Sequence, residues 1–477
     1  MLELLQKGVQ FGEKLGSDFI DVRYDDLALR TLEKMNENYS KILSQKRSGI
    51  GVTCYYKGAV GYSFTASLES KEIMDTVTRA FKLAKSIAPS VLLPLDFDPL
   101  PSIIAKSSNS QLDSLVKIHP DSRDLDYKIN LVDRTSEAAQ SAGKNTRNIR
   151  TLYGEMFGQK LFTNSDQSII DWEFEVIDLR CIVTSKTDEG NLVRGSKGFG
   201  GTRGLEIFEE KGKTPEDFGS IAAKNANEQL EAKACPAGKF RALSENELTG
   251  VLAHESFGHL SEADFVVIEA SPITGKIGER LGTDIVTIID TGIPDIKIHG
   301  GLLVPYDDQG MKAKETIIVN KGILKHYLHN RGTAKLLNQS PTGNCRAINF
   351  TFQAIPRMTN TYFAPGDLTE EEALEKLGTG VYAIQTSGGQ VEGDGNFVFK
   401  AIRGYWVEKG EIKYPLREVS LSGNILNLLT KIEGATKDLK LSSGYFGGCG
   451  KGDQYPLPVG DGGPKLIFSE VTFGGQA

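Results

Sequence analysis

Residues 252–260 read Leu-Ala-His-Glu-Ser-Phe-Gly-His-Leu and place His254, Glu255 and His259 within six positions of a chain that has six histidines. A helix bearing two histidines and a glutamate can offer two neutral ring nitrogens to Zn²⁺ and a carboxylate to the attacking water. In the familiar HExxH pattern the histidines are four apart and share one helix face. Here they are five apart, about 140° around a regular α-helix. Either the helix deforms, or the two histidines do not bind the same ion.

The neighbouring residues favour deformation. Ser244-Glu-Asn-Glu247 is typical of a capping box, and the apolar residues that follow it recur at helical spacing, so we expect a helix to begin near residue 245. Gly258 lacks a Cβ and permits backbone angles that would loosen the helix. A single wide turn with i→i+5 bonding at Phe257-Gly258 would return His259 to the side of His254. We therefore predict a bulge between the two histidines.

The predicted secondary structure differs before and after this stretch. Before it, predicted helices alternate with strands, including a hairpin at Lys57-Gly58 and a helix over residues 214–234 that Cys235-Pro-Ala-Gly238 breaks. After it, short strands separated by turns dominate. We predict an α+β fold with two domains. Residues 1–235 would form an α+β domain with an antiparallel sheet and helices, and residues 236–477 a mostly β domain containing the metal-binding helix.

Two further hairpins are predicted in the second half, at Asn320-Lys-Gly322 and Glu408-Lys-Gly410. The Gly-rich run over residues 195–204 has neither dinucleotide-binding nor P-loop spacing, so we interpret it as hairpin glycines. The acidic pair in Asp307-Asp308-Gln-Gly310 lacks EF-hand spacing and is interpreted as a turn.

Composition excludes several classes of function. The net charge of −7 argues against broad binding of nucleic acid or of anionic membranes. The sequence contains no run of eighteen apolar residues, and its N-terminus lacks the apolar core of a signal peptide. Five scattered cysteines without a CxxC motif are typical of a cytoplasmic protein. We expect a cytoplasmic location, no membrane partner and no nucleic-acid partner.

A catalytic zinc site usually has three protein ligands, so the two histidines require a third ligand from elsewhere in the chain. Cys449 stands out because glycines flank it and Lys451 would favour its thiolate. Taken alone, Cys449 is better explained as a buried free cysteine in a Gly-rich turn, because free cysteines are commonly small core residues. The remaining histidines, His119, His299, His326 and His329, are better explained as surface or polar-core residues.

Two acidic residues shortly after the second histidine have a possible role beside the metal. Glu262 and Asp264 could hold an imidazole in one tautomer, as metal-bound histidines usually require. The alternative is a solvated helix end. Cys449 paired with His254 or His259 could also act as a nucleophile, because the same residues suit either chemistry.

Three motifs in order carry a family resemblance: HExxxH at 254–259, Gly343-Asn-Cys-Arg with Arg357-Met-Thr-Asn-Thr, and Cys449-Gly-Lys-Gly-Asp-Gln followed by Leu457-Pro-Val-Gly460 and Thr472-Phe-Gly-Gly. Together they resemble the TldD/PmbA family of metalloproteases. The resemblance extends to Asp18-Phe-Ile-Asp-Val-Arg and to residues 50–64, and so covers nearly the whole chain. HExxxH and the late cysteine are similar to the TldD branch. One departure is Asp453, where the family pattern has glycine.

The resemblance implies one Zn²⁺ held by His254, His259 and Cys449, with Glu255 as general base. It also implies that the N-terminal domain helps to form a dimer, either a homodimer or a heterodimer with a TldE/PmbA-like paralogue, that encloses the site and admits small or unfolded peptides.

We therefore predict a zinc-dependent peptidase that hydrolyses small or unfolded peptides. Two alternatives remain open. The chain could be a non-catalytic modulator or scaffold subunit whose metal is structural or absent, or it could be a cysteine hydrolase that uses Cys449.

Overall fold

The computed structural model describes residues 1–95, 97, 99–105, 110–392 and 394–474. Its first half builds one seven-stranded sheet in the order β3-β2-β1-β5-β6-β4, with β7 also paired to β6. All of these pairings are antiparallel except that of β4 with β6. The elements are α1 (Leu2–Leu15), β1 (Phe19–Met35), β2 (Asn38–Tyr56), β3 (Ala59–Thr65), α2 (Ser70–Ile87), η1 (Ala88–Ser90), β4 (Ile104–Ala105), α3 (Ser110–Leu115), η2 (Pro120–Ser122), α4 (Leu125–Ala142), β5 (Thr146–Asn164), β6 (Ile169–Lys186), β7 (Leu192–Gly201), η3 (Leu205–Glu209) and α5 (Pro215–Gln229).

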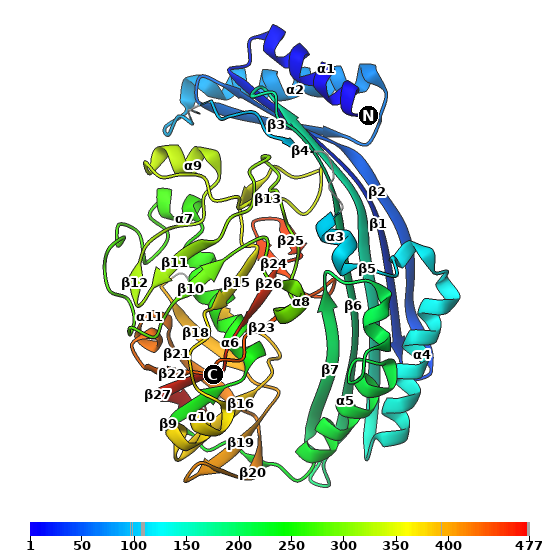
Figure 1. The fold of residues 1–477 in the computed structure, drawn as a ribbon, viewed down its shortest axis with the longest axis vertical. Coiled ribbons are helices and arrows are strands. Elements are labelled where there is room, and N and C mark those ends of the chain that lie inside the picture. The colour runs from blue at the N-terminus through cyan, green and yellow to red at the C-terminus, as the bar shows by residue number, and fades with distance from the viewer. Residues whose placement is uncertain (96, 98, 106–109, 393, 475–477) are drawn as a thin grey trace.

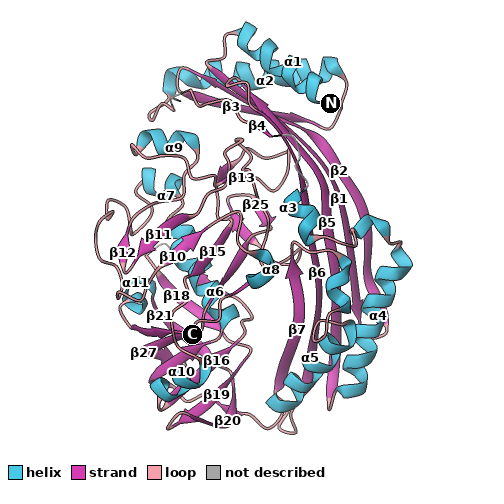
Figure 2. Ribbon diagram, viewed as in Figure 1, coloured by secondary structure: helices cyan, strands magenta, loops and turns pink. Residues whose placement is uncertain are grey.

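The long strands of this sheet curve past the second half of the chain (Figure 1). Helices α4 and α5 cover the outer face of the sheet, α1 and α2 pack at one end, and the opposite face meets the second half (Figure 2). The two faces of the sheet pack against different parts of the chain because successive side chains of the pleated strand β6 point to opposite faces. Ile177 and Leu179 pack in the core under the helices, whereas Trp172 and Phe174 pack with Leu302 of the second half.

The second half is built mainly from short strands in several sheets. The larger sheets have the orders β12-β11-β10-β15-β26-β23 and β17-β18-β21-β27-β9-β16-β19-β20-β8, and β24 pairs only with β25 in a small hairpin. The elements are β8 (Lys233–Ala234), β9 (Gly238–Ser244), α6 (Asn246–Ala253), η4 (His254–Gly258), α7 (Ala263–Val267), β10 (Ile288–Asp290), α8 (Ile296–His299), β11 (Thr316–Asn320), β12 (Ile323–Leu324), α9 (Arg331–Leu336), β13 (Cys345–Arg346), β14 (Ile355–Pro356), β15 (Asn360–Phe363), α10 (Glu370–Leu377), β16 (Gly380–Ile384), β17 (Gly389–Val391), β18 (Asn396–Lys400), β19 (Arg403–Glu408), β20 (Glu411–Arg417), β21 (Ser420–Asn424), α11 (Ile425–Leu429), β22 (Ile432–Ala435), β23 (Lys440–Ser443), β24 (Cys449–Lys451), β25 (Gln454–Leu457), β26 (Gly460–Gly463) and β27 (Leu466–Phe473).

The α+β class and the antiparallel sheet of the first half are confirmed. The three predicted Lys-Gly turns are confirmed too, with both residues of each turn at positive φ: Lys57-Gly58, Lys321-Gly322 and Lys409-Gly410. The Gly-rich run over residues 195–204 lies mostly in β7, the second strand of the antiparallel β6–β7 hairpin, so these hairpin glycines lie in the strand and not in its turn. Among the described residues, no helix is long and apolar enough to cross a membrane.

Candidate metal centre

Helix α6 leads into the turn that carries the two histidines, and the residue that caps its N-terminus differs from the predicted one. Ser244 is the last residue of β9, and its hydroxyl bonds Thr249 Oγ1 at 2.6 Å, so the expected capping box was wrong. Glu245 is the N-cap, because its carboxylate accepts the Glu247 N–H at 3.0 Å. The strand therefore runs directly into the helix. One face of α6 joins the core through Leu248 and Leu252.

The predicted bulge between the histidines is confirmed. Residues His254–Gly258 form one turn of π-helix, η4, and the His259 N–H donates to His254 O five residues back. Gly258 serves this turn through packing, since its φ is not positive. A Cβ at position 258 would lie 1.8 Å from the Sδ atom of Met358, which is itself fully buried. Because Gly258 has no side chain, the π-turn can pack closely against Met358 in the core.

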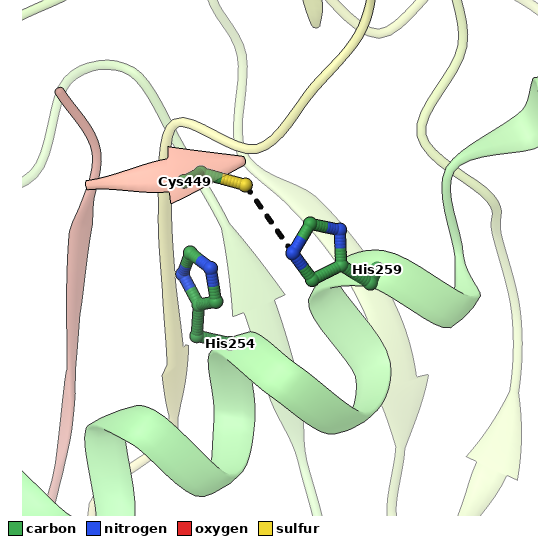
Figure 3. Close-up of side chains that lie close together, drawn as sticks. All are labelled: His254, His259 and Cys449. Atoms are coloured by element: carbon green, nitrogen blue, oxygen red, sulfur yellow. Dashed lines mark hydrogen bonds between the residues drawn. The ribbon is translucent and has the colours of Figure 1, made fainter. Parts of the chain in front are cut away.

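Cys449 meets the two histidines from the separate β24–β25 hairpin (Figure 3). Its Sγ lies 3.3 Å from His259 Nε2, and the two imidazole rings stand almost perpendicular with centroids 5.1 Å apart. One ligand atom from each of the three residues lies within 4.8 Å of the others, and no other such group of His, Cys, Asp or Glu ligands occurs in the described ranges. Tetrahedral zinc separates its donor atoms by about 3.5 Å. Only a small closure is needed, so the donor set fits zinc with a fourth position open.

The residues around the cluster hold it in place. Glu262 Oε2 lies 3.1 Å from His259 Nδ1, which confirms the expected partner of this imidazole. Arg357 donates to the carbonyl of Cys449 at 2.7 Å. Lys451 does not serve the thiolate as expected. Its ammonium group instead pairs with Asp264 at 2.6 Å and with Glu262 at 3.2 Å.

The cluster is charged even without an ion. Burial alone would raise the pKa of the Cys449 thiol, but the two imidazoles outweigh burial and lower that pKa to about 5. Conversely, burial opposes the charged form of His259, while the carboxylate of Glu262 and the thiolate raise its pKa well above the usual range. The thiolate that zinc requires is therefore already favoured.

Glu255 follows His254 and is partly buried. Its carboxylate lies near enough to act electrostatically on His254 and on Asp461. The side chain of His259 is 22% exposed, so the centre is open to solvent on one side.

The other sequence candidates stay apart from this centre. His329 is fully buried and bonded to Thr333 and Gln339, and His119 lies against Glu175, so both are polar-core or partly exposed histidines. Asp307 accepts backbone N–H groups, whereas Asp308 pairs with Lys160 at 2.7 Å. Asp461 could not be identified from sequence reasoning, because an aspartate between two glycines is typical of a turn.

Family models match three consecutive parts of the chain: PmbA/TldA metallopeptidase domain 1 at residues 40–87, the central domain at 118–230 and the C-terminal domain at 237–475. A metalloprotease of Methanocaldococcus jannaschii is 34% identical and covers 97% of both chains. A metalloprotease TldD homolog of Haemophilus influenzae is 30% identical over 90% of this chain and 86% of that one. A zinc metalloprotease TldD homolog of Saccharolobus solfataricus is 28% identical over 98% and 99%.

Solved structures share the fold. TldE from Thermococcus kodakarensis matches with a TM-score of 0.76 at 15% identity, covering 99% of this chain and 100% of that one. A Thermotoga maritima protein, described as a candidate modulator of a DNA gyrase, matches with a TM-score of 0.77 at 21% identity over 99% of both. At these identities the likeness concerns the fold alone. The domain models and the near full-length relatives together show that this chain belongs to the PmbA/TldD family of metallopeptidases, in its TldD branch.

Proposed function

We propose that this chain is a zinc-dependent peptidase in which His254, His259 and Cys449 hold one Zn²⁺ and Glu255 is the general base. The observation that carries the proposal is the convergence of three ligand atoms within 4.8 Å, from one helix turn and a hairpin 190 positions later. Two imidazoles, a thiolate and an open position make a typical catalytic zinc set. The names of the relatives support the same reaction class.

Bound zinc would polarise the scissile carbonyl and lower the pKa of the attacking water to about 7. The chain supplies the proton transfers. Glu255 projects from the turn that carries His254, where its carboxylate would accept a proton from the water as the oxygen attacks the carbonyl carbon. The same carboxyl group would then give that proton to the amide nitrogen as the C–N bond breaks. The side chain of His259 reaches solvent, which supports a substrate such as a small or unfolded peptide that can approach the centre there.

Metal analysis of the purified protein tests the ligand set. We expect about one zinc per chain, and we expect His259→Ala and Cys449→Ala to lose it. Cys181→Ala is a matched control, because Cys181 is also buried but lies in β6, away from the cluster. A parent protein without zinc, or full retention in both ligand variants, would overturn the site.

Glu255→Ala tests the base. This variant should keep its zinc and lose turnover of an unfolded peptide substrate by about 10²–10⁴-fold, because the proton transfer is removed and the ligands are not. A fully active Glu255→Ala enzyme would refute the role of this carboxylate.

A second function is favoured by one specific contact. Cys449 Sγ, His259 and Glu262 form a chain of contacts of 3.3 Å and 3.1 Å, the order found in a nucleophile, base and orienting acid. A cysteine hydrolase would remain active in chelator and would be inactivated by thiol alkylation. The zinc peptidase should lose activity in chelator and regain it on addition of zinc.

We also propose that the active form is a dimer, with a second copy or with a TldE-like chain. The fold that this chain shares with TldE of Thermococcus kodakarensis supports a partner of similar architecture. Light scattering of the chain alone and co-expressed with a TldE-like chain tests this. A mass of 52.0 kDa in both samples would overturn the proposal.

A further inference from the structure

The two histidines differ in their second ring nitrogen. His259 Nδ1 has Glu262 at 3.1 Å, whereas His254 Nδ1 is buried and has no hydrogen-bond partner among the described residues. His254 is only 6% exposed. Leaving a buried polar group unpaired is energetically unfavourable. Metal-bound histidines usually donate this second N–H to a carboxylate, a carbonyl or a water.

Asp461 lies beside the helix turn that precedes His254. It belongs to β26, where it pairs with Thr361 of β15 and Ser442 of β23. A Cβ on Gly250 would lie 2.8 Å from Asp461 Oδ1 and 2.6 Å from the Gly462 nitrogen. Because Gly250 has no side chain, the Asp461 carboxylate can lie directly against the surface of α6.

The geometry of a helix brings His254 to the same place. A helical side chain leans toward the N-terminus over the residue four positions earlier, which for His254 is Gly250. Figure 3 shows the His254 ring rising from the helix beneath Cys449. Glu255 leaves the helix about 100° further round, and its carboxylate acts electrostatically on both His254 and Asp461. Asp461 Oδ1 lies against Gly250, the residue over which the His254 ring leans.

The charges agree with this placement. Burial raises the pKa of Asp461 to about 6, while nearby His254 and Arg180 favour its carboxylate form and Glu255 opposes it. Arg180 is itself bonded to Asp178 at 2.7 Å.

We infer that Asp461 is the positioning residue for His254, accepting the Nδ1–H of the imidazole through one bridging water. This inference rests on the proposed zinc site and extends it. Asp461 would hold the tautomer whose Nε2 lone pair is free for the ion, as Glu262 does for His259. Each metal-binding imidazole would then have its own carboxylate, one from the turn after the helix and one from β26.

The test is the zinc dissociation constant of Asp461→Ala and Asp461→Asn, measured by competition with a chelator. We expect a rise of about 10–100-fold for Asp461→Ala. The zinc dissociation constant of Asp461→Asn should rise less, because the amide oxygen of asparagine still accepts a hydrogen bond. Glu247→Gln is the matched control. Glu247 is another acid that interacts with Arg180 and Asp461, but it lies two turns before Glu255, and its variant should bind zinc as the parent does.

Two further measurements separate positioning from folding. The metal-free Asp461 variants should melt close to the parent, and their Co²⁺ forms should show shifted visible absorption bands, since one imidazole ligand is reoriented. Parent-like zinc affinity and Co²⁺ spectrum in Asp461→Ala would overturn the role of Asp461 and leave the zinc site standing. A parent chain that binds no zinc would overturn both.

Discussion

Gly258→Ala should destabilise the protein, although alanine favours helices. The new Cβ would lie 1.8 Å from Met358 Sδ, where about 3.5–4.0 Å is needed, so the sulfur must retreat by about 2 Å inside a full core. Overpacking of this kind costs about 1–3 kcal/mol. Alanine recovers about 1 kcal/mol of helix propensity. The net loss is then about 1 kcal/mol, rising to about 2 kcal/mol if Met358 cannot adjust.

The effect of Gly258→Ala on the free energy of unfolding should change sign when Met358 is replaced by a shorter residue. Met358→Ala alone costs about 2–5 kcal/mol because it leaves a cavity. In that background the alanine at position 258 has room, so Gly258→Ala should stabilise. Denaturant unfolding of the four metal-free proteins measures this cycle. The zinc dissociation constant should rise in Gly258→Ala, because the π-turn carries His259, and should recover in the double variant.

Additivity within about 0.5 kcal/mol, or an equally stable Gly258→Ala protein, would refute the argument that the glycine is required by close packing.

Three further predictions follow from the site and the turns. In the metal-free protein, alkylation of Cys449 should stay at its plateau as pH falls from 9 and decline only near pH 5, because the two histidines keep the thiol ionised; a decline beginning near pH 8 would contradict this. Glu262→Gln should weaken zinc binding by about 10–100-fold, measured by chelator competition, since the amide holds His259 less strongly. Gly322→Ala should lower the melting temperature more than Gly410→Ala, because both have positive φ but only the Cβ at 322 would lie 2.2 Å from a carbonyl, that of Gly282.

The bulge at the histidines could be predicted from the sequence because spacing on a helix is a strict geometric constraint. Ligands five positions apart require a wide turn, and η4 is such a turn. The third ligand could not be found this way. Cys449 lies on a hairpin that contacts the helix only in the folded chain. Its flanking glycines made it a candidate, and only the family resemblance implied that it is a ligand.

The lengths of the first-half strands could not be predicted either. Strands β1 and β2 have 17 and 19 residues, whereas the alternating apolar residues at the start of β1 end at Tyr24. Arg23 and Asp25 interrupt the apolar pattern, yet both are buried against the second half, where Arg23 pairs with Asp308. Tertiary contacts thus satisfy charges that locally look like a strand end. The division at residues 235 and 236 stays a prediction.

The hairpin that carries Cys449 has a consequence for the chain as a polymer. His259 and Cys449 are 190 positions apart, and β24–β25 is a two-stranded unit of its own. An ion held between them would act as a reversible cross-link that closes a very long loop. Because such an ion binds the folded chain and leaves the unfolded one, it stabilises the fold by about 2.7 kcal/mol when free zinc is about 100 times the dissociation constant. Zinc supply would then govern the lifetime of the folded protein as well as its chemistry.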